Sequence, residues 1–380
     1  GARPISRIYR SWRRNRCDGF CIDARALSSL MYGQRTIALS LLPKAHGDAV
    51  FQGRYRSVAD DFVVTEDLGY EPEGTGPHYW ALIRKRGIST DEAVSRLATV
   101  ARVSRKDLGY AGKKDTHALA TQWISLPETA EIDEGVVDAQ LEVLRLTRNQ
   151  RKLKIGQLAG NEFRLRLQGE VVGELEERLQ HCREHGVPNY FGLQRFGRSG
   201  SNLDAARRLA RRDPKGRRRL HPKDGMAASA ARSAGFNAVL ADRIEADQWL
   251  AVTVGDVVSL AGRGSHFAVT ADELSSVLSR ISSGALDPTA PMAGKQSKTS
   301  ALQAESEAVV LGTDPELLDW MQGVFRDEDR RAVRVLPKHL DAERSENTLE
   351  LSFWLPKGSF ATAVLNELGD LQEAHARTAT

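Results

Sequence analysis

The amino-acid sequence predicts an α+β protein in which one domain is inserted into another. The chain has 380 residues, and at about 100–200 residues per domain this length favours two or three domains. Strand-like patterns are concentrated toward both ends, in residues 35–186 and 338–380, whereas residues 187–337 are more helical and irregular. Hydrophobic residues make up 41% of the chain, which is enough for packed cores. We therefore expect one domain from 35–186 together with 338–380, and an inserted domain from 187–337.

The first part of the chain predicts strands around one helix. Ser89 and Glu92 have the spacing of a capping box, so a helix is expected to begin there. Alternation and β-branched or aromatic residues place strands at 62–66, 79–85, 119–126, 141–146 and 163–168. In the last of these, Phe163 and its apolar neighbours alternate with arginines. This pattern predicts a half-buried strand with a basic outer face.

The second part predicts mainly helices, with strands returning at the end. Apolar stripes mark helices around 175–182, 203–210 and 236–244, and short strands are expected at 253–261 and 265–270. The Gly-, Pro- and Ser-rich stretch 284–300 is expected to be a loop. Asp314 before Pro315 predicts a helix start, since proline favours the first helical position. A strand at 349–355 and a last helix at 361–371 complete the prediction.

The charge of the chain is nearly balanced but unevenly distributed. Lys and Arg number 54 against 50 Asp and Glu, which gives a formal charge of +4. The segment 145–154 holds five basic residues and no acid, and the segment 207–219 holds eight basic residues and one acid. Such runs suit phosphate neutralisation, although a solvated helix face or loop is the alternative. The candidates for phosphate contacts are Arg151, Lys152, Arg217, Arg218 and Arg219.

Several classes of protein are excluded or disfavoured. No stretch approaches 18 consecutive apolar residues, so we expect no membrane span. Cys17, Cys21 and Cys182 are too few for a disulfide framework and indicate a reducing, cytoplasmic environment. Residues 1–34 form an Arg-rich extension that we expect to be flexible. Its composition also resembles a transit peptide, but it lacks the long hydrophobic region of a secretion signal.

The motifs of common cofactor and metal enzymes are missing. The sequence has no phosphate-binding loop, no dinucleotide fingerprint, no H-E-x-x-H or C-x-x-C pair and no G-x-S-x-G elbow. We therefore expect neither a cofactor nor a metal. What does stand out is the segment 109–117, Gly-Tyr-Ala-Gly-Lys-Lys-Asp-Thr-His, between a predicted helix and a strand. Its two lysines would keep Asp115 ionised and able to act as nucleophile or base. A surface turn with a Lys–Asp pair is the alternative.

This segment, extended to Gln122-Trp123, resembles the signature around the catalytic aspartate of the TruD family of tRNA pseudouridine synthases. Residues 186–197 (Gly-Val-Pro-Asn-Tyr-Phe-Gly-Leu-Gln-Arg-Phe-Gly) resemble the second hallmark of that family. Three more blocks fit in the same order: 160–163 (Gly-Asn-Glu-Phe), 229–237 (Ser-Ala-Ala-Arg-Ser…Phe-Asn) and 354–362 (Trp-Leu-Pro-Lys-Gly-Ser-Phe-Ala-Thr). The resemblance runs from about residue 36 to about residue 370 and leaves residues 1–34 uncovered.

The resemblance implies a V-shaped molecule with a pseudouridine-synthase catalytic domain, a mixed sheet with flanking helices, and an inserted α/β domain. It implies isomerisation of uridine to pseudouridine in tRNA without a cofactor, at position 13 in the bacterial members. Asp115 matches the catalytic aspartate. The matching nucleotide-binding positions are Phe62, Asn161 and Phe360, together with Phe163, which would lie against the target base. These types suit a base that must leave its stack, because an aromatic ring can stack on it and an amide can pair with uracil.

Several points stay open at this level. The sequence does not decide whether Asp115 attacks the sugar or removes a proton from it. Lys114 and Arg56 are both possible charge partners, and at Arg56 the resemblance leads us to expect Lys. His117 near a strand start is more often a packing residue than a general acid. A tRNA-binding scaffold without chemistry and a phosphate-handling enzyme are the alternative functions, and a monomer is the favoured oligomeric state.

Overall fold

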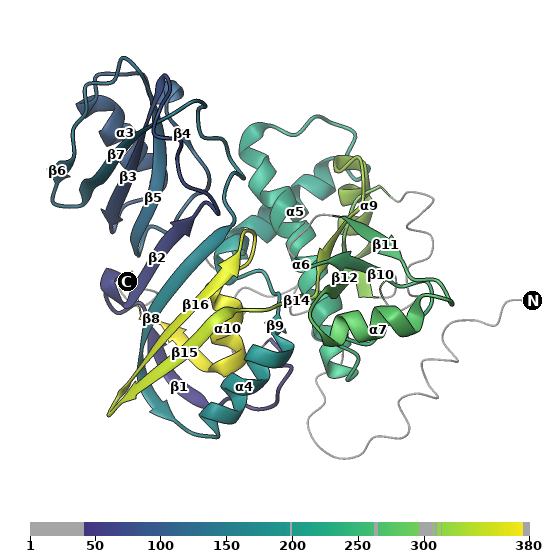
Figure 1. Cartoon of the computed structure of the whole chain (residues 1–380). Coiled ribbons are helices and arrows are strands. Elements are labelled where there is room, and N and C mark those ends of the chain that lie inside the picture. Colours follow the sequence, from purple (N-terminus) through teal and green to yellow (C-terminus); the bar gives the residue numbers. More distant parts are fainter. Residues whose placement is uncertain are drawn as a thin grey trace, which may run out of the picture.

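The computed structural model describes residues 42–197, 200–261, 265–295, 307, 310–312 and 314–374. The predicted extension 1–34, with Cys17 and Cys21, therefore lies outside the described residues. Two parts stand side by side in Figure 1: one is built on a large mixed sheet, and the other holds most of the long helices and a small sheet. This arrangement confirms the predicted α+β class, while the exact domain boundaries stay a prediction.

The large sheet is assembled from both ends of the chain. Its order is β15 (Lys338–Ser345), β16 (Thr348–Pro356), β8 (Gly160–Val171), β2 (Phe62–Asp67), β5 (Leu119–Pro127), β3 (His78–Arg86), β7 (Leu141–Asn149) and β6 (Gly135–Asp138). Three short strands join it at the side: β4 (Gly109–Tyr110) pairs with β5, β1 (Phe51–Tyr55) pairs with β8, and β17 (Gly369–Glu373) pairs with β1. Strand β8 buries Phe163, Leu165 and Leu167 and exposes the arginines between them, as predicted.

In the described part of the chain, this sheet is accompanied by the helices α3 (Thr90–Val100), α4 (Leu175–His185) and α10 (Ala361–Leu368). Helix α3 begins as expected, because the Ser89 side chain accepts a hydrogen bond from the Glu92 backbone at 3.1 Å. Helix α10 is shorter than predicted. The backbone of Gly369 is extended, and from this residue β17 pairs in parallel with β1. The two strands approach so closely that a Cβ on Gly369 would lie 2.0 Å from Phe51 O. The predicted helix at 361–371 was therefore wrong at its end, because strand pairing outcompetes the last turn.

The second part contains α5 (Ser201–Arg212), α6 (Gly225–Glu245), α7 (Leu274–Ser282) and α9 (Pro315–Val324). Its four strands follow the order β11 (His266–Ala268), β10 (Val257–Leu260), β12 (Leu286–Met292) and β13 (Asp329–Ala332). Asp314 caps α9 through the Leu317 backbone at 3.2 Å, as the sequence predicted. Helix α6 is buried along most of its length and forms the centre of this part.

The expected loop at 284–300 is wrong over residues 286–292, which form β12, while 296–300 lie outside the described residues. Two prolines argue against an internal strand. However, the side chains from Leu286 to Pro291 are buried, and Pro288 O accepts from Val333 N at 2.9 Å. Packing of the strand against α6 outweighs the local composition.

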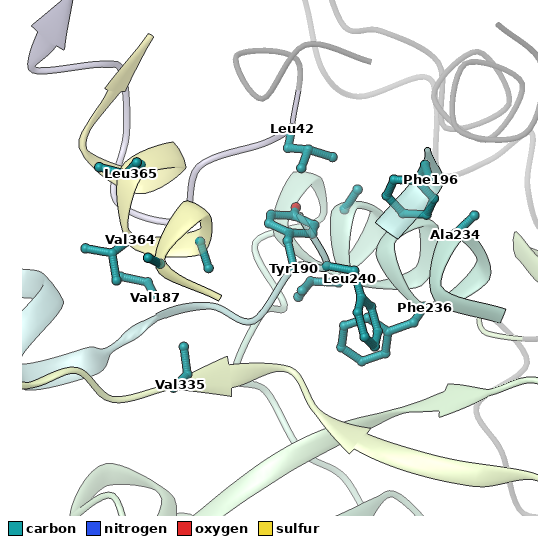
Figure 2. Close-up of a cluster of buried hydrophobic side chains, with 14 of the residues drawn as sticks. Leu42, Val187, Tyr190, Phe196, Ala234, Phe236, Leu240, Val335, Val364 and Leu365 are labelled. Carbon is teal, nitrogen blue, oxygen red and sulfur yellow. The ribbon is translucent and has the colours of Figure 1, made fainter. Parts of the chain in front are cut away.

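The two parts share one hydrophobic core. Where the chain passes between them, β9 (Val187–Pro188) pairs antiparallel with β14 (Arg334–Val335), so the outgoing and returning segments lie together. Figure 2 shows this region, with Val187 and Val335 facing Val364 of α10 and with Tyr190 beside Leu240 of α6. The continuous core holds the segment 189–197 firmly between the sheet and α6. Within the described residues, no helix is both long and apolar enough to cross a membrane.

Candidate active site

A cavity of about 260 Å³ opens where β2 and β8 meet the loop after β4. Its wall includes every residue that the sequence proposed for catalysis and nucleotide binding: Asp115, Phe62, Asn161, Phe163 and Phe360, with Lys114 and Arg56. The segments 192–194 and 357–362 close the remaining sides. The volume lies just below the usual range for ligand pockets, about 300–1,000 Å³, which suits a small ligand such as a single nucleoside.

Arg56 is the charge partner of Asp115. It is 1% exposed, forms an ion pair with the Asp115 carboxylate, and binds Glu373 at 2.7 Å. Its guanidinium lies 3.8 Å from the centre of the Phe62 ring. Burial disfavours the charged form of Arg56, but Asp115 and Glu373 outweigh burial and leave its pKa raised. The cavity therefore keeps a permanent cation beside a carboxylate that is 32% exposed.

Arg56 also has a strained backbone, with φ of 60° in the left-handed region. This conformation costs a non-glycine residue about 1–3 kcal/mol and persists only where the surroundings enforce it. The contacts with Asp115, Glu373 and Phe62 supply that enforcement. The strain is thus located at the charged centre of the cavity.

Gln194 is a residue that the sequence did not single out. In the orientation that satisfies both neighbours, its amide donates to Asp115 Oδ1 at 2.6 Å and its carbonyl accepts from Arg56 Nη1 at 2.5 Å. The signal was present, since Gln194 lies in the second block of the family resemblance, 186–197, but nothing local indicates that this block reaches Asp115. Gln194 therefore bridges the carboxylate of Asp115 and the guanidinium of Arg56.

The lysines beside Asp115 do not contact its carboxylate. Lys113 pairs with Asp91 at 2.7 Å, and Lys114 pairs with Glu66 at 2.9 Å. The prediction that Lys114 could be the charge partner of Asp115 is therefore wrong. Adjacent residues in an extended loop point in opposite directions, so the neighbour in sequence is not the neighbour in space.

Buried polar groups hold the loop that carries Asp115 in place. Lys85 Nζ donates to the Asp115 backbone carbonyl at 2.6 Å and to Ile88 O at 2.8 Å. Burial lowers the pKa of Lys85 to about 8, with the Asp115 charge opposing and the Lys114 charge adding to the shift. Thr90 Oγ1 accepts from Lys114 N at 2.9 Å. These contacts set the position of Asp115 before any substrate binds.

The loop contains two glycines, Gly109 and Gly112. Neither Gly109 nor Gly112 has a positive φ, so tight turning does not explain them. A Cβ on Gly109 would lie 2.2 Å from Leu153 O, which shows that this glycine permits close packing of two backbone segments. The loop is therefore packed against the chain that follows β7.

Asn161 is oriented by charged neighbours. Lys114 Nζ donates to Asn161 Oδ1 at 2.6 Å, and Glu66 in turn accepts from the Trp123 backbone at 3.1 Å while it pairs with Lys114. Because a lysine can only donate, this contact fixes the amide with Oδ1 toward Lys114 and Nδ2 on the other side of the amide group. The amide thus presents hydrogen-bond donors to the cavity.

The aromatic residues form a partly buried wall. Phe163 is 9% exposed, stacks on Phe353 with ring centres 5.4 Å apart, and meets the edge of Phe62 at 6.1 Å. Phe360 precedes α10 and lies 5.7 Å from Phe191. Phe163 therefore has two roles, because it lines the cavity and also packs in the core.

The remaining predicted residues lie outside this cavity. Arg217, Arg218 and Arg219 are exposed, and in the described part of the chain no carboxylate lies within ion-pair distance of their guanidinium groups. Arg151 is exposed, and Lys152 donates to Lys106 O at 2.9 Å. His117 is exposed and is not part of the cavity wall. In the described ranges, no cluster of three or more His, Cys, Asp and Glu could hold a metal ion.

Comparisons with known proteins agree with the resemblance seen in the sequence. The family model of tRNA pseudouridine synthase D (TruD) matches residues 45–217 and 218–368. The tRNA pseudouridine synthase D of Pectobacterium atrosepticum is 40% identical over 332 residues, which span 85% of this chain and 94% of that protein. A crystal structure from Methanosarcina mazei, assigned as a putative tRNA pseudouridine synthase D, matches 92% of this chain and 99% of that chain. The match has a TM-score of 0.65 at 22% sequence identity, and it supports the fold. Because the family model and the Pectobacterium relative each cover most of its length, the chain belongs to the tRNA pseudouridine synthase D (TruD) family, isomerases that convert uridine in tRNA to pseudouridine.

Proposed function

We propose that Asp115 isomerises a tRNA uridine, expected at position 13, inside the cavity between β2 and β8. The observation that carries this proposal is one partly exposed carboxylate, paired with the buried Arg56 and held by Gln194, in a cavity of nucleoside size. The bond from the sugar to uracil N1 must break, the uracil must turn, and a bond from the sugar to C5 must form. The proton on C5 must then leave, and N1 must gain a proton. Asp115 would attack the sugar or remove a proton from it, and both routes need an ionised carboxylate near the sugar.

Recognition of uracil is the second element of the proposal. The Asn161 amide hydrogens would donate to a carbonyl oxygen of the base, because Lys114 holds the amide oxygen toward itself and so fixes the side on which the hydrogens lie. Cytosine presents an amino group where uracil has O4, so a fixed donor at that edge would disfavour it. The aromatic edge of Phe163 and the ring of Phe360 would then hold the extruded base between apolar surfaces.

The partner is a folded tRNA, whose phosphates must lie outside the cavity. Exposed arginines without carboxylate partners are the natural contacts, and Arg217, Arg218 and Arg219 satisfy this condition in the described structure. Arg151 and Lys152 lie nearer to the loop of Asp115, where the chain after β7 packs against Gly109. We also place the protein in the cytoplasm, where its free and buried Cys182 stays reduced.

Chemical mapping of pseudouridine in unmodified tRNA, with and without the purified protein, tests this function. We expect one new pseudouridine, at position 13, and no signal in tRNA that lacks a uridine there. A protein that binds tRNA tightly but leaves every uridine unchanged would instead be a scaffold without chemistry. That result would contradict the proposal.

A further inference from the structure

A short turn, residues 154–157, lies at the mouth of the cavity. Gly156 N donates to Ala111 O at 2.8 Å, directly before Gly112 of the cavity wall. Lys357, another residue of the wall, donates from Nζ to Gly156 O at 2.9 Å. The next apolar residue, Leu158, itself lines the cavity. The turn therefore belongs to the rim on the side of the Asp115 loop.

Ile155 at the tip of this turn points into solvent. It is 78% exposed, whereas Leu153 before it is buried in a cluster with Trp80 and Trp123. Single exposed apolar residues are common on protein surfaces and need no explanation by themselves. Ile155 differs from the other exposed apolar residues in its position. It lies at the edge of a cavity that must receive a base from a stacked nucleic acid.

The turn is rigid as well as exposed. Gln157 N donates to Lys154 O at 3.1 Å, and Lys154 N donates to the Gln157 side chain at 2.6 Å. The preceding backbone packs so closely on Gly109 that no side chain fits there. A side chain on such a turn needs little ordering when a partner binds, which favours its use as a contact.

The surroundings of Ile155 are basic. The stretch 145–154 carries five basic residues and no acid, and the three nearest to Ile155 in the sequence are Arg151, Lys152 and Lys154. Arg151 and Lys154 are exposed. A phosphate backbone would therefore be attracted to the very turn that presents an apolar tip. An apolar side chain between cations is typical of proteins that insert a wedge into a base stack.

We propose that Ile155 is a wedge that enters the RNA stack in the space left by the extruded uridine. This inference rests on the function proposed above. Extruding a base costs a few kcal/mol in lost stacking, and an apolar side chain placed between its former neighbours offsets part of that cost. Ile155 touches the neighbouring bases and not the reacting atoms. Ile155 would raise the fraction of tRNA in which the target uridine is extruded, while Asp115 acts in breaking the bond between the sugar and the base.

The test compares two substrates and three variants by single-turnover pseudouridine formation. One substrate is intact tRNA, and the other carries abasic sites on both sides of the target uridine, which is then already unstacked. Ile155→Ser removes the wedge, and Ile155→Leu keeps an apolar tip of the same size. Val136→Ser is the matched control, because Val136 is 77% exposed on β6. Thermal unfolding of each variant verifies the fold.

We expect Ile155→Ser to lower the rate on intact tRNA by about tenfold or more, while its rate on the abasic substrate stays within about twofold of wild type. Ile155→Leu should retain most of the rate on both, and Val136→Ser should match wild type. Equal rates for Ile155→Ser and wild type on intact tRNA, or equal losses on the two substrates, would overturn the wedge. If wild type itself forms no pseudouridine on either substrate, the proposed function fails instead.

Discussion

Replacing Arg217, Arg218 and Arg219 together by alanine should change how tRNA binding depends on salt. The three side chains are exposed and lack carboxylate partners in the described structure, so each is available to replace one condensed counterion. Losing three phosphate contacts should flatten the slope of log affinity against log salt by about 2.1–2.7. Between 50 and 200 mM salt, the advantage of wild type in affinity should then shrink by about 20- to 40-fold.

The assay is a titration of unmodified tRNA binding at several salt concentrations, followed by steady-state kinetics. The variant should show a raised KM and an unchanged kcat at saturation, since these residues lie outside the cavity. The control triple Arg84, Arg105 and Arg166→Ala removes the same formal charge, but each of these arginines is already paired with a carboxylate. If the first triple variant keeps the salt slope of wild type, or if the control changes the slope equally, the arginines 217–219 are not phosphate contacts.

Three further perturbations follow from the site. Phe163→Leu should retain the fold better than Phe163→Ala, because the Phe163 ring also packs on Phe353. Both variants should lose about 1–3 kcal/mol of stacking energy between the ring and the target base. If both variants turn over at the wild-type rate, with Tm measured as the control for folding, the ring does not contact the base. Arg56→Lys keeps the positive charge but removes the planar guanidinium that pairs with both Asp115 and Glu373. The kcat/KM of this variant should therefore fall by about 10-fold or more. A fully active variant would contradict the assigned pairing. Lys85 has a pKa of about 8 when folded and 10.5 when unfolded, so the unfolded chain binds more protons between these values and stability should rise with pH across that window. Urea unfolding of wild type should show this rise relative to Lys85→Met, and parallel curves for the two proteins would refute it.

Several elements of the fold were predictable because their signals are local. Alternation in β8, the cap of α3 by Ser89 and the proline start of α9 each depend on a few consecutive residues. The end of α10 and the strand β12 were not predictable, because partners from distant segments decide them. Gly369 pairs with Phe51, and the prolines of β12 are held between β10 and β13.

The same distinction applies to the site. The resemblance to the family gave the residues that gather in the cavity, but the charge partner of Asp115 depends on the three-dimensional path of the chain. Sequence adjacency favoured Lys114, whereas the structure joins Asp115 to Arg56 from the β1–β2 connection and to Gln194 from the segment 189–197. Lys114 instead fixes the Asn161 amide, a role that no local pattern indicates.

The most direct test of the account is the Asp115→Asn variant in a single-turnover assay with parallel tRNA binding. Asparagine has nearly the shape of aspartate but no charge, so the variant should form no pseudouridine and still bind tRNA at least as tightly as wild type. Asp133→Asn is the matched control, because Asp133 is an exposed carboxylate outside the cavity wall, and it should be fully active. If Asp115→Asn forms more than a trace of pseudouridine, Asp115 does not carry out the reaction, and the proposed centre is wrong.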